Sequence, residues 1–362
     1  MDKRLCENTA SPFYGEAENM MRAVAFAALV LLLFPLLLPG AASAQGSLNV
    51  YCSVQAEWCQ AIATEFQRQT GVKVAITQKG SGEALAQITA EAANPKGDVW
   101  FGGTGDPHLQ AAEQNLTLPY KSPNLDTLHD WARRQAEQSG FKTVGIYAGA
   151  LGFGYNPELL QKKKLIPPAC WKDLLKAEYK DEIQIANPNS SGTAYVAIAT
   201  IVQLFGEDEA FRYLRQLHKN VNQYTRSGTG PIKAVARGET SISISFMHDG
   251  VTEAVAGFPV KTQAPCEGTG YEIGSMSLIK GARNLDNAKT FVDWALTAPA
   301  QKLGADTKQF QVPSNREAKL PPQAPKLSEI KLINYDFAKY GSKAERKRLI
   351  DRWEKDVNSQ PK

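Results

Sequence analysis

The stretch Ile183-Gln-Ile-Ala-Asn-Pro-Asn-Ser-Ser-Gly-Thr193 starts as a short apolar strand and ends in small polar residues, after which a long helical segment begins. A helix start leaves backbone N–H groups unpaired and carries a partial positive charge, so it attracts an anion. Gly192 would let the backbone approach a ligand closely, and Ser190, Ser191 and Thr193 add hydroxyl groups. Simple N-capping of the helix by Ser or Asn is the alternative. The remainder of the chain has to decide between them.

On the N-terminal side of this stretch, apolar strands alternate with helices. We expect strands over 48–51, 72–77 and 98–101, and the helix after the first strand repeats its apolar residues every four positions from Trp58 to Phe66. We expect that helix to end at Gly71. The alternation predicts an α/β fold with a mainly parallel sheet.

Hydroxyl residues follow each of these strands. Ser53, Ser81 and Thr104 all lie in turns rich in small residues, and Ser81 is expected to cap the next helix. Ligands of open α/β sheets bind beyond the carboxyl ends of the strands. Each residue alone is typical of a turn, but together they predict one wall of a polar site.

A second group of elements follows Thr193. The helix 194–205 is apolar nearly all round and is expected to be buried. A small-residue turn at 222–231 precedes another helix, and an alternating strand at 241–246 runs into His248 and Asp249. If these two residues continue the strand, their side chains point in opposite directions.

The N-terminus predicts export. An apolar run, 23–39, follows Arg22 and precedes Ala42-Ser43-Ala44, the pattern of a cleaved secretory signal, and the run is short for a membrane span of about 20 residues. Residues 1–44 are therefore interpreted as a signal peptide with an over-long start, and the periplasm as the destination.

Charge and cysteines narrow the class of protein. The net charge of +4 comes from scattered basic residues, which argues against a nucleic-acid partner. The cysteines beyond the signal are Cys52, Cys59, Cys170 and Cys266. An even count in an oxidising compartment favours disulfides, with Cys52 near Cys59 and Cys170 then paired with Cys266. Metal binding is the competing interpretation, but no tight Cys/His spacing supports it.

Three motifs resemble a known family. Asp98-Val-Trp-Phe-Gly-Gly-Thr-Gly-Asp106, Asn187-Pro-Asn-Ser-Ser-Gly-Thr193 and Phe246-Met-His-Asp-Gly250 are similar to those of type 2 extracellular solute-binding proteins of ABC importers. Their branch is the one associated with ferric iron, hexose phosphates and phosphonates. The resemblance covers nearly the whole mature chain. It implies a type 2 periplasmic-binding-protein fold: two lobes, each with a mixed, mainly parallel sheet flanked by helices, and a ligand cleft between them.

The resemblance also implies an organisation. We expect residues 45–146 and 276–318 in the first lobe, 147–275 in the second, and C-terminal helices in 319–362 packing back on the lobes. The extended segments 143–155 and 273–279 would cross between the lobes. The implied partners are a small anionic solute and an inner-membrane ABC permease, with capture by hinge closure, a monomeric receptor and no cofactor.

The ligand is narrowed by chemistry. Iron binders of this family present adjacent tyrosines, whereas none of the twelve tyrosines here neighbours another, which argues against ferric iron. A phosphorylated solute needs N–H and hydroxyl donors at one end and acceptors for its hydroxyls at the other. By resemblance to the hexose-phosphate binders, Ser53, Thr104, His248, Asp249 and Glu272 are ligand contacts.

Alternatives remain open. An aminoalkylphosphonate would use the same donors and pair its ammonium with Asp249 and Glu272, and His248 with both carboxylates would make a poorer iron site. The chain lacks a G-x-S-x-G motif, its cysteines are interpreted as structural, and we expect no enzyme, although a periplasmic phosphatase is a further alternative. The predicted ligand-binding residues are Ser53, Ser81, Thr104, Ser190, Ser191, Gly192, Thr193, Thr225, Ser227, Gly228, Thr229, His248, Asp249 and Glu272, with no metal ligands.

Overall fold

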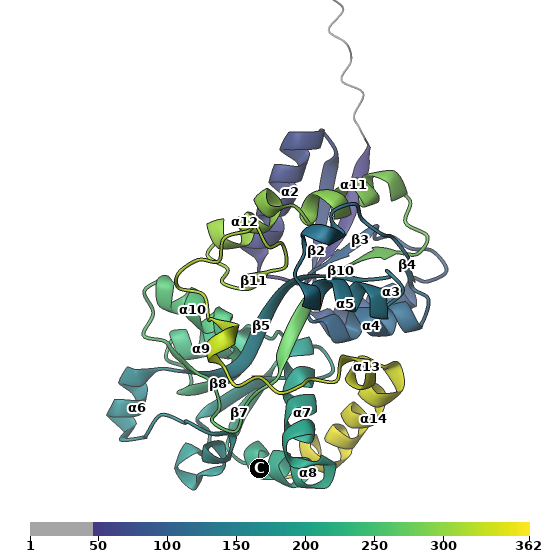
Figure 1. Cartoon of the computed structure of the whole chain (residues 1–362). Helices are drawn as coiled ribbons and strands as arrows, with labels where there is room; N and C mark the ends of the chain where they lie inside the picture. The colour runs from purple at the N-terminus through teal and green to yellow at the C-terminus, as the bar shows by residue number, and fades with distance from the viewer. Residues whose placement is uncertain (1–45) are drawn as a thin grey trace, which may run out of the picture. The chain divides into compact units, whose positions relative to one another are not determined.

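The computed structural model describes residues 46–362. The predicted signal peptide lies outside the described residues. Within the described part, two groups of strands are joined by one long shared strand, β5 (Val144–Tyr155) (Figure 1). No helix in this part is both long and apolar enough to cross a bilayer.

The first group of strands forms a mixed sheet. Its order is β2 (Lys73–Gln78), β1 (Ser47–Cys52), β3 (Val99–Phe101), β10 (Tyr271–Ile279) and the first half of β5. β1 pairs in parallel with β2 and β3, while β10 is antiparallel to β3 and β5. The connecting helices are α2 (Ala56–Thr70), α3 (Ser81–Ala90) and α4 (Gly105–Glu113). The predicted parallel α/β arrangement is confirmed here, and Gly71 ends α2 in the left-handed conformation as expected.

The second group uses the other half of β5. Its order continues with β8 (Ile242–Phe246), β6 (Ile183–Ala186) and β7 (Val221–Thr225), and β9 (Lys261–Gln263) pairs with β5. β6 is parallel to both β7 and β8. The accompanying helices are α7 (Gly192–Phe205), α8 (Glu207–His218), α9 (Gly230–Ala236) and α10 (Met247–Val255). The apolar helix predicted after Thr193 is α7, which is buried from Gly192 to Val202.

β5 changes partners in the middle. Ala150 is the last β5 residue that pairs with β10, and Leu151 is the first that pairs with β8. We call the part built on β1, β2, β3 and β10 the first lobe, and the part built on β6, β7, β8 and β9 the second lobe. Each has its own apolar core, and the lobe boundaries predicted above stay predictions.

The remaining elements cover these sheets. They are β4 (Thr117–Leu118), α5 (Asp130–Gln138), α6 (Pro157–Lys163), α11 (Leu285–Ala295), α12 (Ala298–Asp306), β11 (Val312–Pro313), α13 (Phe337–Tyr340) and α14 (Lys343–Trp353), with short helical turns at 125–127, 171–175, 177–179, 327–329 and 354–358. Both predicted disulfides, Cys52–Cys59 and Cys170–Cys266, are present.

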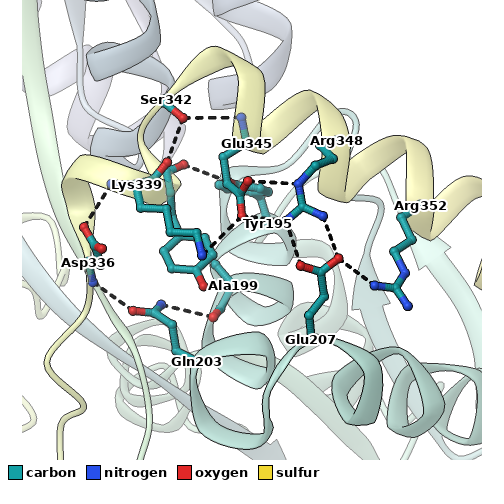
Figure 2. A network of polar contacts seen from close by, with 11 residues as sticks. Tyr195, Ala199, Gln203, Glu207, Asp336, Lys339, Ser342, Glu345, Arg348 and Arg352 are labelled. Carbon is teal, nitrogen blue, oxygen red and sulfur yellow. Dashed lines mark hydrogen bonds and ion pairs between the residues drawn. The ribbon is translucent and has the colours of Figure 1, made fainter.

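The C-terminal helices are attached to α7 and α8 by a polar network (Figure 2). Arg348 makes a bidentate contact to Glu207, with N–O distances of 2.6 and 2.7 Å, and Arg352 reaches the same carboxylate at 2.6 Å. The Tyr195 hydroxyl donates to the Tyr340 carbonyl at 2.7 Å. Leu349 and Trp353 of α14 are buried in the apolar core of the second lobe. α14 is therefore part of the second lobe by its packing.

Candidate ligand-binding site

A cavity of about 520 Å³ lies between the two lobes. Most of the residues predicted from sequence as ligand contacts line it, and they come from both lobes. These lining residues are Ser53, Ser81, Thr104, Ser191, Gly192, Thr193, Ser227, Gly228, Thr229, His248, Asp249 and Glu272. A polar cavity of this size suits a small solute.

Helix N-termini from both lobes meet at this cavity. The first turns of α2, α3 and α4 approach it from the first lobe, and those of α7, α9 and α10 from the second. Each end carries unpaired N–H groups and roughly half a positive charge. The strand-to-helix alternation produces this convergence because every such turn leaves the carboxyl end of a strand. The walls therefore favour an anion.

The hydroxyls at the starts of α4 and α7 make no hydrogen bond within the part of the chain that the structure describes. Thr104 and Ser191 occupy the N-cap positions of α4 and α7, yet neither side chain makes a capping hydrogen bond. Each is 2% exposed, and neither hydroxyl oxygen has a hydrogen-bond partner among residues 46–362. Burying an unpaired hydroxyl is costly. Ser191 therefore holds the N-cap position of α7, as the alternative interpretation expected, but its hydroxyl does not make the capping hydrogen bond, and its role as a ligand contact stays a prediction.

Ser81 differs from its prediction as a cap. Gly80 holds the N-cap position of α3, and Ser81 is the first helical residue. The Ser81 hydroxyl instead accepts a hydrogen bond from the Thr104 N–H at 3.1 Å. Ser81 therefore fixes the turn that presents Thr104.

Gly192 is required by a close approach. A Cβ atom at this position would lie 1.8 Å from Thr104 Oγ1, across the gap between the lobes. In the second lobe, a Cβ at Gly228 would lie 2.2 Å from Thr193 Oγ1. Neither residue has a positive φ, so space rather than backbone conformation demands glycine. The two glycines therefore let the elements at the anion-binding end of the cavity pack closely against each other.

His248 and Asp249 correct one expectation. They belong to the first turn of α10 rather than to the preceding strand, so both side chains face the cavity instead of opposite sides. His248 Nε2 lies 3.5 Å from Asp249 Oδ1 and 3.8 Å from Glu272 Oε1, and the His248 Nδ1 has no partner among the described residues. Glu272 comes from β10. This end of the cavity is lined by imidazole and carboxyl groups.

Burial decides the charge of this end. It lowers the pKa of His248 to about 3, so the ring is neutral near pH 7. It raises the pKa of Asp249 to about 7, a shift opposed by the charge of Lys233, and raises that of Glu272 well above its usual range, helped by Asp249. Protonated carboxyls and a neutral imidazole can both donate to and accept from hydroxyl groups.

Several lining residues escaped the sequence reasoning. The Tyr147 hydroxyl accepts from the Gly103 N–H at 3.0 Å, and Gln55 donates to Asp249 Oδ1 at 2.5 Å across the lobes. Gln55 follows the first strand as Ser53 does, so the strand-end rule would have found it. Tyr147 lies inside a buried strand, where no local signal marks it. The other polar lining residues outside the predicted set are Glu57, Gln78, Lys79, Glu83, Arg226, Lys233 and Gln311.

Ser190 and Thr225 are not among the lining residues. The Ser190 hydroxyl donates to the Arg226 carbonyl at 2.7 Å, and the Thr225 hydroxyl donates to the Ser227 carbonyl at 2.9 Å. Both side chains are thus used to shape the two loops of the second lobe. Their role as direct ligand contacts stays a prediction.

The group of side chains spaced closely enough to hold a metal ion lies outside the cavity. Among residues 46–362, the His, Cys, Asp and Glu side chains close enough to share one ion are Cys170, Cys266 and Glu267. Their two cysteines are already joined in a disulfide. The carboxylates of the cavity do not form such a group.

Fold and cavity together define a two-lobed receptor for a small solute. A family model described as "Bacterial extracellular solute-binding protein" matches residues 97–340. The chain belongs to this family and serves as the solute-binding component of an ABC transporter. An uncharacterized protein of Haemophilus influenzae is 48% identical over 88% of this chain and 92% of its own length.

Named relatives differ in their solutes. A putative 2-aminoethylphosphonate-binding periplasmic protein of Salmonella typhimurium is 27% identical, covering 67% of this chain and 70% of its own. The periplasmic binding protein AfuA from Actinobacillus pleuropneumoniae, solved with exogenous fructose-6-phosphate bound, has a TM-score of 0.85 at 46% identity and covers 87% of this chain and 99% of its own. Iron-bound HitA from Pseudomonas aeruginosa, at a TM-score of 0.71 and 22% identity over 84% of this chain and 98% of its own, shares the fold.

Proposed function

We propose that this chain is a periplasmic receptor that captures a small phosphorylated solute, with a hexose phosphate favoured, and delivers it to an inner-membrane permease. It acts without turnover, as a binding protein rather than an enzyme. The main support for this proposal is that the two ends of one cavity differ in chemistry. One end has helix N-termini with the unpartnered hydroxyls of Thr104 and Ser191, and the other has His248, Asp249 and Glu272.

The first end suits the phosphate group. Backbone N–H groups and hydroxyls all donate to anionic oxygen, and an anion between helix starts is stabilised by their partial charges. The second end suits sugar hydroxyls, because each hydroxyl is both a donor and an acceptor and so are the groups that face it. The likeness to AfuA, which was solved with fructose 6-phosphate, supports the same pairing of ends.

An aminoalkylphosphonate is the second candidate. It is favoured by the Salmonella relative and by the two carboxyls at the second end, which would pair with an ammonium once ionised. Burial raises the pKa of both carboxyls, so an ammonium ligand has to overcome the cost of ionising them. A hydroxyl ligand has no such cost.

The test is calorimetric titration of the mature protein with fructose 6-phosphate, glucose 6-phosphate, 2-aminoethylphosphonate, inorganic phosphate and ferric citrate. We expect a sugar phosphate to bind most tightly, with no release of inorganic phosphate over hours. Tight binding of ferric citrate alone would refute the proposal, and steady phosphate release would indicate a phosphatase.

Variants assign the two ends. Ser191→Ala removes one donor to the anion and is expected to weaken fructose 6-phosphate and inorganic phosphate alike, by roughly 10-fold or more, as for a hydrogen bond to a charged group. Glu272→Gln is expected to weaken the sugar phosphate and leave inorganic phosphate unchanged. Equal losses for both ligands in both variants would mean that the ends are not distinct.

A further inference from the structure

The two lobes touch through backbone beside the anion-binding end. A Cβ atom at Gly80 would lie 2.8 Å from the Ser190 carbonyl oxygen, and one at Gly82 would lie 2.6 Å from the Asn189 carbonyl oxygen. Both glycines have ordinary negative φ, so any residue fits their backbone, and only the approach of the other lobe excludes a side chain. We call residues 80–83 and 189–190, with Arg226, the closure seam.

One ion pair crosses this seam. Arg226 of the second lobe donates to Glu83 of the first, while Glu83 also accepts from the Gly80 N–H at 3.2 Å. On its own side, the carbonyl of Arg226 accepts from the Ser190 hydroxyl at 2.7 Å. The Glu83 carboxylate thus ties the first turn of α3 to the loop that precedes α9. Arg226 lines the cavity and is largely exposed, and its ion pair is with this carboxylate.

Closure brings like charges together. The starts of α3 and α4 in the first lobe face the start of α7 in the second, and a Cβ at Gly192 would already overlap Thr104. Each helix start carries about half a positive charge, so bringing them into contact is unfavourable unless an anion lies between them. The backbone contact at the closure seam forms only when these helix starts come close together.

We propose that the closure seam is an anion-gated lock: Gly80 and Gly82 allow the lobes to meet, the Glu83–Arg226 pair fastens them, and only an anionic ligand makes closure favourable. This inference rests on the proposed function. Under this proposal, Glu83 and Arg226 determine ligand specificity through their ion pair across the seam. Arg226 is the partner of Glu83 and not the counter-ion of the ligand. A neutral sugar would satisfy the second end of the cavity but would leave the lobes apart.

Removing the Glu83 carboxylate has opposite expected effects on ligand binding if the pair fastens the lobes and if Arg226 contacts the ligand directly. Removing a carboxylate from beside a bound anion should tighten binding if Arg226 serves the ligand. Under the lock, Glu83→Gln instead speeds dissociation of fructose 6-phosphate by about fivefold, the effect of losing one partly exposed ion pair. Stopped-flow dilution measures the rate. Glu65→Gln, which breaks the Glu65–Arg68 pair within α2, is the matched control and is expected to change nothing.

Gly82→Ala tests the contact itself. Alanine favours the helix α3, so the ligand-free variant should melt at or above the wild-type temperature. Its methyl group prevents full closure, so fructose 6-phosphate should bind roughly 10-fold or more weakly and X-ray scattering should show less compaction than in the wild type. Scattering with fructose should show no compaction of the wild type.

The outcomes are distinct. Slower or unchanged dissociation in Glu83→Gln, full compaction of Gly82→Ala, or compaction by fructose would each overturn the lock while leaving the proposed function intact. If fructose 6-phosphate, 2-aminoethylphosphonate and inorganic phosphate all fail to bind the wild type, the proposed function fails and the lock fails with it.

Discussion

Burial brings the protonation of Asp249 close to neutral pH. Burial raises its pKa to about 7, with Lys233 and the Gln55 hydrogen bond opposing the shift and Glu253 adding to it. Burial lowers the pKa of its neighbour His248, so that ring stays neutral. A receptor for a hydroxyl-bearing solute benefits from such groups because they need no counter-ion in the buried cavity.

We predict that Asp249→Asn changes how stability depends on pH. Between about pH 4 and 7 the folded wild type keeps the Asp249 proton while the unfolded chain loses it, so the free energy of unfolding falls as pH rises, by up to about 1.4 kcal/mol for each pH unit. Asparagine cannot ionise, and the variant should lose this fall. Urea unfolding at pH 4, 6 and 8 measures it.

His248 remains in both proteins, so its opposite contribution cancels in the comparison. Wild type and Asp249→Asn are expected to differ least at pH 4 and most at pH 8, with the variant the more stable. Parallel pH profiles would show that Asp249 has an ordinary pKa.

At the scale of elements, α14 packs against the loop that precedes α7 and so supports one wall of the cavity. The Arg346 guanidinium is buried, lies 4.6 Å above the Tyr195 ring and donates to the Pro188 carbonyl at 3.0 Å. Its charge also acts on Asp106 in the first turn of α4, where burial raises the pKa to about 6. Through Arg346, α14 contacts the loop before α7, and the charge of Arg346 opposes the rise in the pKa of Asp106 in the first lobe. The ion pairs of Arg348 and Arg352 hold the same helix on α8 (Figure 2).

We predict that Arg346→Met destabilises the protein by about 1–3 kcal/mol, because it leaves the Pro188 carbonyl without its charged donor and removes the positive charge that acts on buried Asp106. Adding Asp106→Asn should restore part of this loss, since the buried carboxyl is then gone. Lys347→Met on the same helix is the control, because Lys347 pairs with Asp351 on the exposed face. Urea unfolding of all four proteins decides, and equal losses in the single and double variants would contradict the explanation.

At the scale of the molecule, the second lobe depends on a long-range covalent link. Cys170–Cys266 joins segments 96 residues apart, and Cys266 is exposed, whereas Cys52 and Cys59 are buried in the first lobe. The cross-link encloses β6 to β9 of the second lobe, so it constrains the unfolded state of nearly that whole lobe.

We predict that a mild reductant opens Cys170–Cys266 first and lowers the free energy of unfolding by about 2–4 kcal/mol. A Cys170→Ala/Cys266→Ala variant should show that loss without reductant and no further loss with it. Mass spectrometry after alkylation identifies the reduced pair. Alkylation of Cys52 and Cys59 before the other pair would refute this order.

The sequence by itself determined the class of fold and most of the cavity lining. Strand ends followed by Ser53, Thr104, Ser191 or Thr229 are local signals, and the topology of parallel strands carries such turns to one edge. Local propensity also set α7 and the end of α2 at Gly71.

Only the tertiary structure decided which hydroxyls of the cavity are left unpaired and which make hydrogen bonds within the protein. Whether a hydroxyl caps a helix, as expected for Ser81, or is left unpaired, as in Ser191, depends on what the other lobe places beside it. The turn from β8 into α10 moved His248 and Asp249 onto one side, and burial among distant elements set their charges. Contacts across the lobes join residues far apart in sequence, so no local pattern encodes them.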